Sequence, residues 1–115
     1  MTVQEIIERL NLGVVTAAEL NRQITGGYAS DLLSCVMAGA KAGNVWVTLQ
    51  AHPNVVAVAS LLDLAAVVIT EGITPDTETT AKAEQNSVTL LRTQRPTFVV
   101  VGELTAMGVK GTGAE

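Results

Sequence analysis

Gln23-Ile24-Thr25-Gly26-Gly27-Tyr28-Ala29-Ser30-Asp31-Leu32-Leu33 places two adjacent glycines just before a serine and an apolar segment. Paired glycines are typical of a tight loop, because they permit backbone conformations with positive φ. Ser30 is a suitable N-cap for the helix that follows. The apolar residues of that helix recur at helical spacing: Leu32, Leu33, Val36, Met37 and Ala40. We therefore predict a loop over 19–27 and then an amphipathic helix that ends at Gly43-Asn44 and packs on a sheet.

The composition favours a single α/β domain. At 115 residues the chain has the commonest length for one domain with one core. Hydrophobic residues make up 48% of the chain and charged residues 16%, and the aromatic residues are Tyr28, Trp46 and Phe98. Small aliphatic side chains must therefore fill the core. Such side chains suit strands that are covered on both faces, as in a parallel sheet.

Strand and helix signals alternate along the chain. Strands are predicted at 12–16, 44–50, 65–70 and 87–92. Helices are predicted after the capping box that starts at Thr2, from Ser30, from Pro53 to Leu64, and from Thr74-Pro75 to Asn86. Residues 97–107 have strand propensity at Phe98-Val99-Val100-Val101. Pro96 at a first helical position and Gly108 as a stop favour a closing helix instead, which we adopt.

This alternation predicts a three-layer α/β domain with a mainly parallel sheet of about four strands flanked by helices. The domain is expected to span 1–109. The tail 110–115 has no apolar anchor and is expected to be flexible. The helix from Asn54 to Leu64 is apolar on nearly every face, so we expect the sheet to cover one part of it and a second copy of the chain another.

Charge and cysteine content exclude several classes of protein. The net charge is −4 and no cluster of Lys or Arg is present, which argues against a nucleic-acid partner. A single cysteine, Cys35, forms no internal disulfide, and the first residues do not resemble a signal peptide, so a cytoplasmic protein is expected. The longest apolar segment, Val55 to Ile69, is too short and too polar to span a membrane.

The carboxyl ends of parallel strands are the expected binding edge, because the helices that follow direct their N-terminal N–H groups there. The predicted ligand-binding residues are Thr25, Gly26, Gly27, Tyr28, Ser30, Asp31, His52, Thr70 and Gly72. Two interpretations of the glycine pair stay open: it cradles a phosphate or ribose, or it forms only a tight turn. His52 is either a ligand contact or a loop side chain satisfied within the protein.

Catalytic and metal signals are weak. Cys35 falls in the apolar stripe of its helix, which favours a buried structural thiol over a nucleophile. Asp31, His52 and Cys35 have no spacing that brings them together as a catalytic trio. One histidine and one cysteine offer no paired metal ligands, and no phosphate-binding loop of the Walker type is present. We therefore predict no cofactor, no metal site and no enzymatic activity.

Three segments resemble the DRTGG domain family: 25–34 around Thr25-Gly26-Gly27, 46–54 from Trp46 to Asn54, and 68–76 from Val68 to Asp76. The chain departs from the family name, because Gln23-Ile24 precedes the Thr-Gly-Gly sequence where an Asp-Arg pair is expected. Such domains occur beside CBS domains in inorganic pyrophosphatases, at the front of some phosphate acetyltransferases, and in distant form as the N-terminal part of HPr kinase/phosphorylase. The resemblance implies an α/β regulatory or dimerisation module without catalysis of its own.

Short free-standing relatives are similar to bacterial and archaeal cytoplasmic proteins, some of them encoded near iron hydrogenase subunits or histidine-kinase-like proteins. Three functions follow as hypotheses. The first is a homodimeric regulatory module that senses a nucleotide or another small phosphorylated ligand. The second is an adaptor that docks onto a larger enzyme or kinase and binds nothing small. The third, an enzyme that uses the carboxyl-edge residues, is the least favoured.

Overall fold

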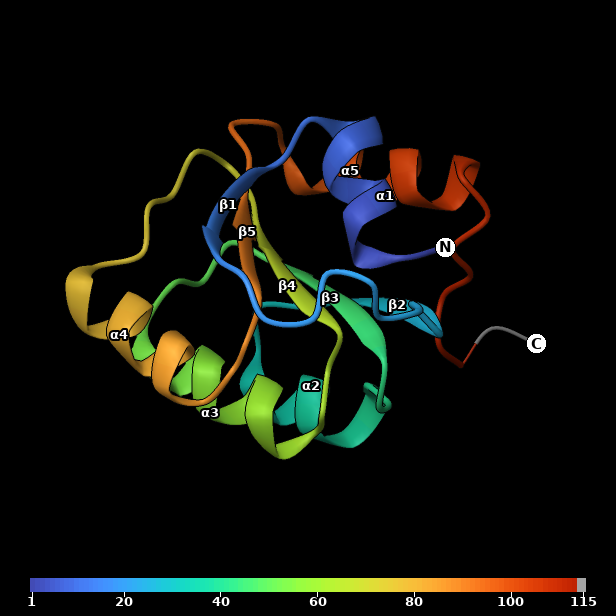
Figure 1. The fold of residues 1–115 in the computed structure, drawn as a ribbon. Helices are drawn as coiled ribbons and strands as arrows, with labels where there is room; N and C mark the ends of the chain where they lie inside the picture. Colours follow the sequence, from blue (N-terminus) through green and yellow to red (C-terminus); the bar gives the residue numbers. More distant parts are fainter. Residues whose placement is uncertain (114–115) are drawn as a thin grey trace.

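The computed structural model describes residues 1–113, which contain five helices and five strands (Figure 1). In chain order the elements are α1 (Val3–Leu10), β1 (Gly13–Thr16), β2 (Gly26–Ala29), α2 (Leu33–Gly39), β3 (Asn44–Thr48), α3 (Pro53–Leu61), β4 (Ala66–Ile69), α4 (Thr77–Gln85), β5 (Leu90–Arg92) and α5 (Thr97–Ala106). The predicted helix at 97–107 is confirmed by α5.

The strands form one sheet in the order β1-β5-β4-β3-β2. β2, β3, β4 and β5 are parallel, whereas β1 pairs with β5 in the antiparallel direction. The predicted mainly parallel α/β sheet is therefore confirmed. Its membership differs from the prediction, because the segment 12–16 is an antiparallel edge strand and the fourth parallel strand is β2.

β2 lies where a loop was predicted, so the prediction of a loop over 19–27 was wrong at Gly26 and Gly27. Strands are recognised in a sequence by apolar residues that alternate or form a short run. β2 begins with two glycines and has no such pattern. Its pairing with β3, from Gly26 opposite Asn44 to Ala29 opposite Val47, holds it in the sheet. Strand formation here depends on a partner distant in sequence and not on local propensity.

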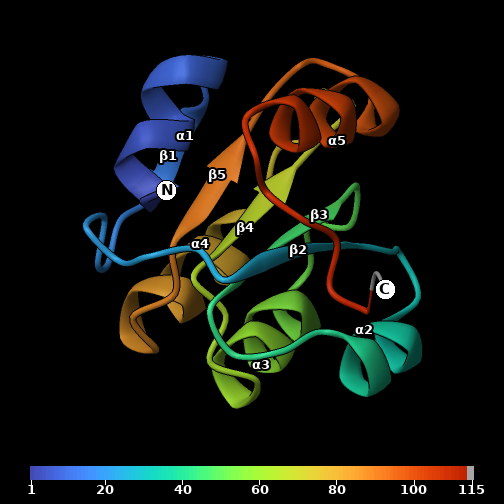
Figure 2. The ribbon, with the colours of Figure 1, turned by 90° about the vertical axis from the view of Figure 1, so that its right-hand side faces the viewer.

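Helices cover both faces of the sheet, as Figures 1 and 2 show: α1 and α5 lie on one face, and α2, α3 and α4 on the other. The side chains of β3 explain this arrangement. Val45 and Val47 are buried in the cluster beneath α1 and α5, whereas Trp46 is buried in the cluster beneath the other three helices. Because both faces of the sheet are covered, β3 and β4 are buried along their whole length.

The helix starts were predicted correctly in two places. Thr2 and Glu5 form the expected capping box at α1, with each side chain bonded to the backbone of the other residue. Pro53 is the first residue of α3, as expected. At α4 the prediction was wrong: the N-cap is Asp76 and not Thr74, and the bond from the Thr79 N–H holds the pKa of the Asp76 carboxyl below its usual value.

α2 is shorter and more exposed than predicted. Its N-cap is Leu32 and not Ser30, although the Ser30 hydroxyl accepts a hydrogen bond from the Leu32 N–H. Only Val36 of the helix is buried, while Cys35 and Met37 are exposed. The prediction of a buried structural thiol was therefore wrong. α2 lies at the end of its helix layer over the edge strand, where the sheet covers a narrow face of the helix.

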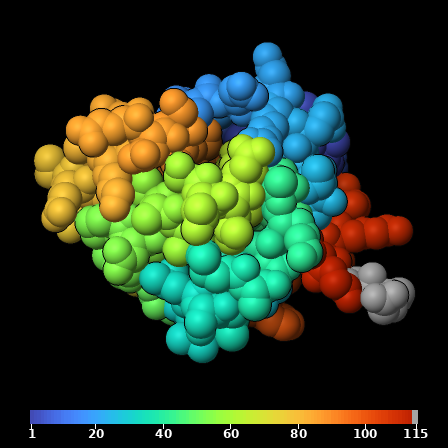
Figure 3. Space-filling view, turned by 90° about the horizontal axis from the view of Figure 1, so that it is seen from below, coloured from blue at the N-terminus to red at the C-terminus, as the bar shows by residue number. Residues whose placement is uncertain are grey.

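α3 lies between α2 and α4, and the three helices are packed side by side in Figure 3. Val55, Val56, Val58 and Ala59 are buried within the chain itself. The apolar character of this helix is therefore largely explained by the sheet and two neighbouring helices. Within residues 1–113 no helix has the length and apolar character needed to cross a bilayer.

The segment after α5 returns to the sheet along β2. Gly111 forms a parallel bridge with Gly27: the Gly27 N–H donates to the Lys110 carbonyl at 2.9 Å, and the Thr112 N–H donates to the Gly27 carbonyl at 2.8 Å. The expected flexible tail is thus anchored as far as Thr112, through backbone bonds that an apolar pattern does not reveal. The rest of that expectation concerns residues 114 and 115, which lie outside the described part of the chain.

Candidate functional site

The four parallel strands end at one edge of the sheet, here called the carboxyl edge. It consists of the residues that follow β2, β3, β4 and β5, namely 30–32, 49–52, 70–72 and 93–95. Of the nine predicted ligand-binding residues, five lie here: Ser30, Asp31, His52, Thr70 and Gly72. Their hydrogen bonds show what each side chain does in the folded chain.

Asp31 and His52 belong to one network that passes through Gln50. The Asp31 carboxylate accepts hydrogen bonds from the Thr48 hydroxyl at 2.8 Å and from the Leu49 N–H at 2.9 Å. The Gln50 amide N–H donates to the Asp31 carbonyl, and the Gln50 amide oxygen lies 2.7 Å from His52 Nε2. The sequence therefore predicted correctly that these residues share an edge, but no direct contact joins Asp31 to His52.

His52 also begins α3. Its Nδ1 accepts a hydrogen bond from the Asn54 N–H at 3.3 Å, so the imidazole serves as the N-cap of the helix. Both ring nitrogens have partners in the protein, and this supports the interpretation of His52 as a satisfied loop side chain. A general base would need a free nitrogen directed at a substrate.

The residues after β4 hold the start of α5. The buried Thr70 hydroxyl lies 2.6 Å from the Thr97 hydroxyl, and the Glu71 carboxylate accepts from the Thr97 N–H at 2.8 Å. Gly72 has φ +74°, and a Cβ at this position would lie 2.6 Å from the Gln94 side-chain oxygen. The positive φ therefore favours glycine here, and a side chain would also require the flexible Gln94 amide to move aside.

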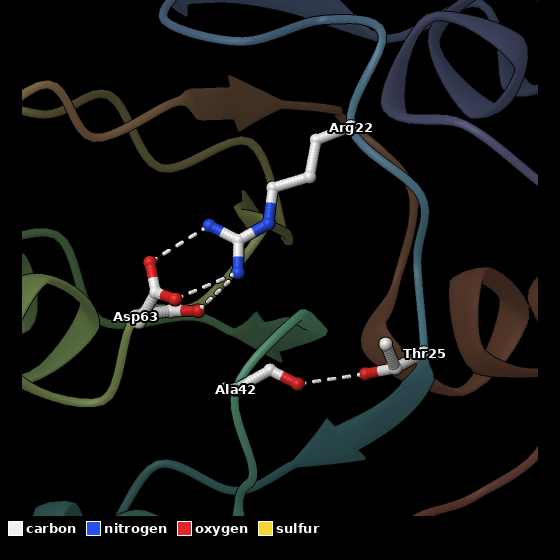
Figure 4. A network of polar contacts seen from close by, with 4 residues as sticks. All are labelled: Arg22, Thr25, Ala42 and Asp63. Carbon is white, nitrogen blue, oxygen red and sulfur yellow. Dashed lines mark hydrogen bonds and ion pairs between the residues drawn. The ribbon is translucent and has the colours of Figure 1, made fainter.

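Thr25 and Gly26 lie at the opposite edge, because they precede β2 or begin it. The Thr25 hydroxyl donates to the Ala42 carbonyl at 2.8 Å, as Figure 4 shows. The same figure shows Arg22 forming an ion pair of 2.8 Å with Asp63, whose carboxyl pKa is held below its usual value by the hydrogen bond from this arginine. The structure thus contradicts the expected position of the Thr-Gly-Gly loop at the carboxyl edge.

Gly26, the first residue of the glycine pair, has a packing role. Neither Gly26 nor Gly27 has positive φ, contrary to the reasoning from the sequence. A Cβ on Gly26 would lie 2.8 Å from the Thr112 hydroxyl and 3.1 Å from the Lys110 carbonyl, whereas a Cβ on Gly27 would meet only ordinary contacts of 3.4 Å or more. Gly26 therefore provides the space in which the C-terminal segment approaches β2.

Tyr28 and Gly27 line a groove that the sequence did not indicate. It has a volume of about 240 Å³ and lies between α5 and β2, with Val47, Val101, Leu104 and Val109 among its apolar walls. It exists because α5 and the C-terminal segment meet β2 from two sides. No local sequence signal predicts it, since it depends on where residues 109–112 return to the sheet.

Among residues 1–113 no group of three or more His, Cys, Asp or Glu side chains is arranged to hold a metal ion. Cys35 forms no hydrogen bond with Asp31 or His52 in this part of the chain, so the three do not form a hydrogen-bonded catalytic trio. The side chains of Asp31, His52 and Glu71 at the carboxyl edge are bonded to backbone groups of the loops and of the first turns of α3 and α5.

No protein-family model matches the sequence, and no curated protein matches it. Among solved structures, the chain is similar to the CBS and DRTGG domains of the regulatory region of Clostridium perfringens pyrophosphatase, crystallised with the activator diadenosine tetraphosphate. The TM-score is 0.67 at 14% sequence identity, over 88% of this chain and 44% of that one. The chain thus spans less than half of that structure. The likeness shows a shared fold.

Proposed function

We propose that this chain is a non-catalytic regulatory module that forms a homodimer and senses a nucleotide or another small phosphorylated ligand at its carboxyl edge. The observation that carries this proposal is the common edge at which β2, β3, β4 and β5 end. Ligands of open α/β sheets bind outside such strand ends. The likeness to a regulatory region that was crystallised with an activating dinucleotide adds support.

The absence of catalysis is supported by the roles of the polar side chains at this edge. His52 caps α3, Glu71 accepts from the first N–H of α5, and Asp31 accepts from the loop after β3. A general acid or base acts on substrate atoms, which requires a group that is not already committed to the scaffold. A ligand bound here would instead act on the loops that start α3 and α5.

Homodimerisation is proposed through apolar side chains that the chain leaves uncovered. Phe98 is 89% exposed at the start of α5, and Leu32 and Leu49, which follow β2 and β3, are exposed as well. Large exposed apolar side chains are typical of protein contacts. A homodimer of standard size buries on the order of 800 Å² per partner. The expected contact through α3 stays a second proposal, because Leu61 of that helix is 70% exposed although α2 and α4 flank it.

The ligand and the dimer are tested separately. In a thermal-shift screen over nucleotides, dinucleotide polyphosphates and acyl phosphates, a ligand at a hundred times its dissociation constant stabilises the fold by about 2.7 kcal/mol. Sedimentation at tens of micromolar tests for the dimer, with Phe98→Ser as the variant that should weaken it. A strict monomer with no stabilising ligand would refute both parts of the proposal.

The second candidate function is an adaptor that docks onto a larger enzyme or kinase, including one associated with a hydrogenase. The exposure of Phe98, Val99 and Leu49 favours it, since the same apolar surface suits a different protein as well as a second copy. The two functions differ in the thermal-shift screen: the adaptor gives no shift with any of the small ligands. It also predicts that Phe98→Ser leaves the sedimentation of the isolated chain unchanged.

A further inference from the structure

Arg92 is the last residue of β5 and lies opposite Gly13 of β1. A Cβ on Gly13 would lie 3.2 Å from Arg92 Cγ and 4.0 Å from its Cδ, so the arginine stem crosses the backbone of β1 at the position where no side chain stands. The side chain is partly buried. The packing of its stem therefore restricts where its guanidinium group can lie.

The guanidinium of Arg92 has no acceptor among residues 1–113. Its Nε is buried without a hydrogen-bond partner. Arg22 and Arg95, in contrast, form ion pairs with Asp63 and Glu103. A buried donor left without an acceptor destabilises a fold, and a charged donor does so more strongly. No hydrogen bond or ion pair within residues 1–113 compensates the charge of Arg92.

An open polar groove of about 320 Å³ lies beside this side chain at the carboxyl edge. Its lining consists of Asn11, Gly13, Arg92, Thr93, Gln94 and Arg95. This lining contains no carboxylate, and Glu103 neutralises Arg95 from outside the groove. The volume is near the lower end of the range for small-molecule sites, about 300–1,000 Å³. The charge of Arg92 thus faces a groove that holds no counter-charge.

We propose that Arg92 anchors a phosphate group of a small ligand in this groove. The two terminal nitrogens of a guanidinium form a fork that matches two phosphate oxygens, and this fork does not require access to the buried Nε. The amides of Asn11 and Gln94 and the hydroxyl of Thr93 supply neutral donors for the remaining oxygens. The inference rests on the proposed function only in taking the sensed ligand to be phosphorylated. The chemistry is shared by inorganic phosphate, pyrophosphate and the phosphate of a nucleotide.

The probes are inorganic phosphate and pyrophosphate, added to the uniformly ¹⁵N-labelled chain and followed by NMR. Sodium chloride at matched ionic strength is the control titration. We expect saturable shifts of the Thr93 and Gln94 amides and of the Arg92 Nε–H signal. Shifts that fail to saturate, or that chloride reproduces, would overturn the proposal.

Arg92→Gln should weaken phosphate binding about tenfold or more, because it removes the charge and the fork. Lys41→Gln removes the same charge next to the start of β3, at the opposite edge of the sheet, and should leave binding unchanged. If Arg92→Gln does not fold, Arg92→Lys keeps the stem and charge without the fork and should still bind more weakly than the natural chain. Equal affinity in a folded Arg92 variant would refute the anchor.

Adenosine and AMP, titrated in the same way, separate this inference from the proposed function. If AMP still binds to the Arg92→Gln variant, ligand sensing remains supported, but the phosphate of AMP does not bind at Arg92. If inorganic phosphate binds only while Arg92 is present, and no nucleotide or acyl phosphate binds, the role of Arg92 is supported. The proposal that the chain senses a nucleotide or acyl phosphate is then refuted. AMP binding that exceeds adenosine binding only while Arg92 is present supports both.

Discussion

Alanine in place of Gly26 should destabilise the fold, whereas alanine in place of Gly27 should not, although the two residues are neighbours in one strand. A Cβ on Gly26 would lie 2.8 Å from the Thr112 hydroxyl, 3.1 Å from the Lys110 carbonyl and 3.3 Å from the Asn44 amide nitrogen. A Cβ on Gly27 would lie no closer than 3.4 Å to any atom. Gly26→Ala therefore overpacks the contact with the C-terminal segment, and Gly27→Ala does not.

The magnitude follows from the contacts that must change. The Thr112 hydroxyl has to leave its 2.7 Å hydrogen bond to Asn44, at a cost of about 1 kcal/mol. Moving the Lys110 backbone adds about 1–3 kcal/mol for overpacking. Restricting the unfolded chain offsets about 0.4–1 kcal/mol. We expect Gly26→Ala to destabilise the fold by about 1–4 kcal/mol, and Gly27→Ala to be neutral or to stabilise it by up to about 1 kcal/mol.

Urea unfolding followed by Trp46 fluorescence measures both variants, because Trp46 is the only tryptophan and is fully buried. A double variant isolates the cause: Thr112→Ala removes the closest atom, so Gly26→Ala should cost less in that background. Amide exchange at the Thr112 N–H, which donates to the Gly27 carbonyl, should speed up in Gly26→Ala alone. Equal stabilities of the two alanine variants would refute the packing role of Gly26.

Three further predictions concern single side chains. Thr70→Val keeps the buried shape but removes the hydroxyl bond to α5, so the free energy of unfolding should fall by about 1 kcal/mol in urea. Asp63→Asn removes the ion pair with Arg22; since the folded-state pKa of Asp63 is lowered, its contribution is present at neutral pH and is lost as the pH falls through that pKa. Because the Asp63 side chain is 71% exposed, the difference between this variant and the natural chain should stay below about 1 kcal/mol at neutral pH and vanish once acid has protonated the Asp63 carboxylate. Cys35 should react with a thiol reagent in the folded protein at a rate close to that of a small free thiol, and slow reaction limited by unfolding would contradict its exposure.

The central part of the fold could be predicted from the sequence because its signals are local and strong. The apolar runs that became β3 and β4 are buried on both faces, and such runs are recognised without knowledge of their partners. The capping box at Thr2 and the proline at the start of α3 are also local signals, and each predicted the start of its helix correctly. α5 was harder, since its valines favour a strand, and Pro96 and Gly108 indicated the correct choice.

The parts that could not be predicted depend on partners distant in sequence. β2 contains two glycines and is a strand only because β3 pairs with one side of it and Gly111 with the other. Because β2 is a strand, Thr25 lies just before its first residue, at the edge of the sheet opposite the carboxyl edge. The expected loop site was therefore misplaced because one strand was not predicted. Ser30 and Asp31 stayed at the carboxyl edge, since they follow the strand whether or not the glycines belong to it.

The same geometry separates the residues that hold the carboxyl edge together from those that are available to a ligand. Asp31, His52 and Glu71 are already bonded to backbone groups that set the starts of loops and helices. Arg92 has no such bond within residues 1–113 and borders an open groove. A ligand bound to Arg92 as proposed would also contact the loop 93–95, which leads directly into α5 and the exposed Phe98. A regulatory module requires that one binding event changes another surface, and in this fold a short covalent path joins the two.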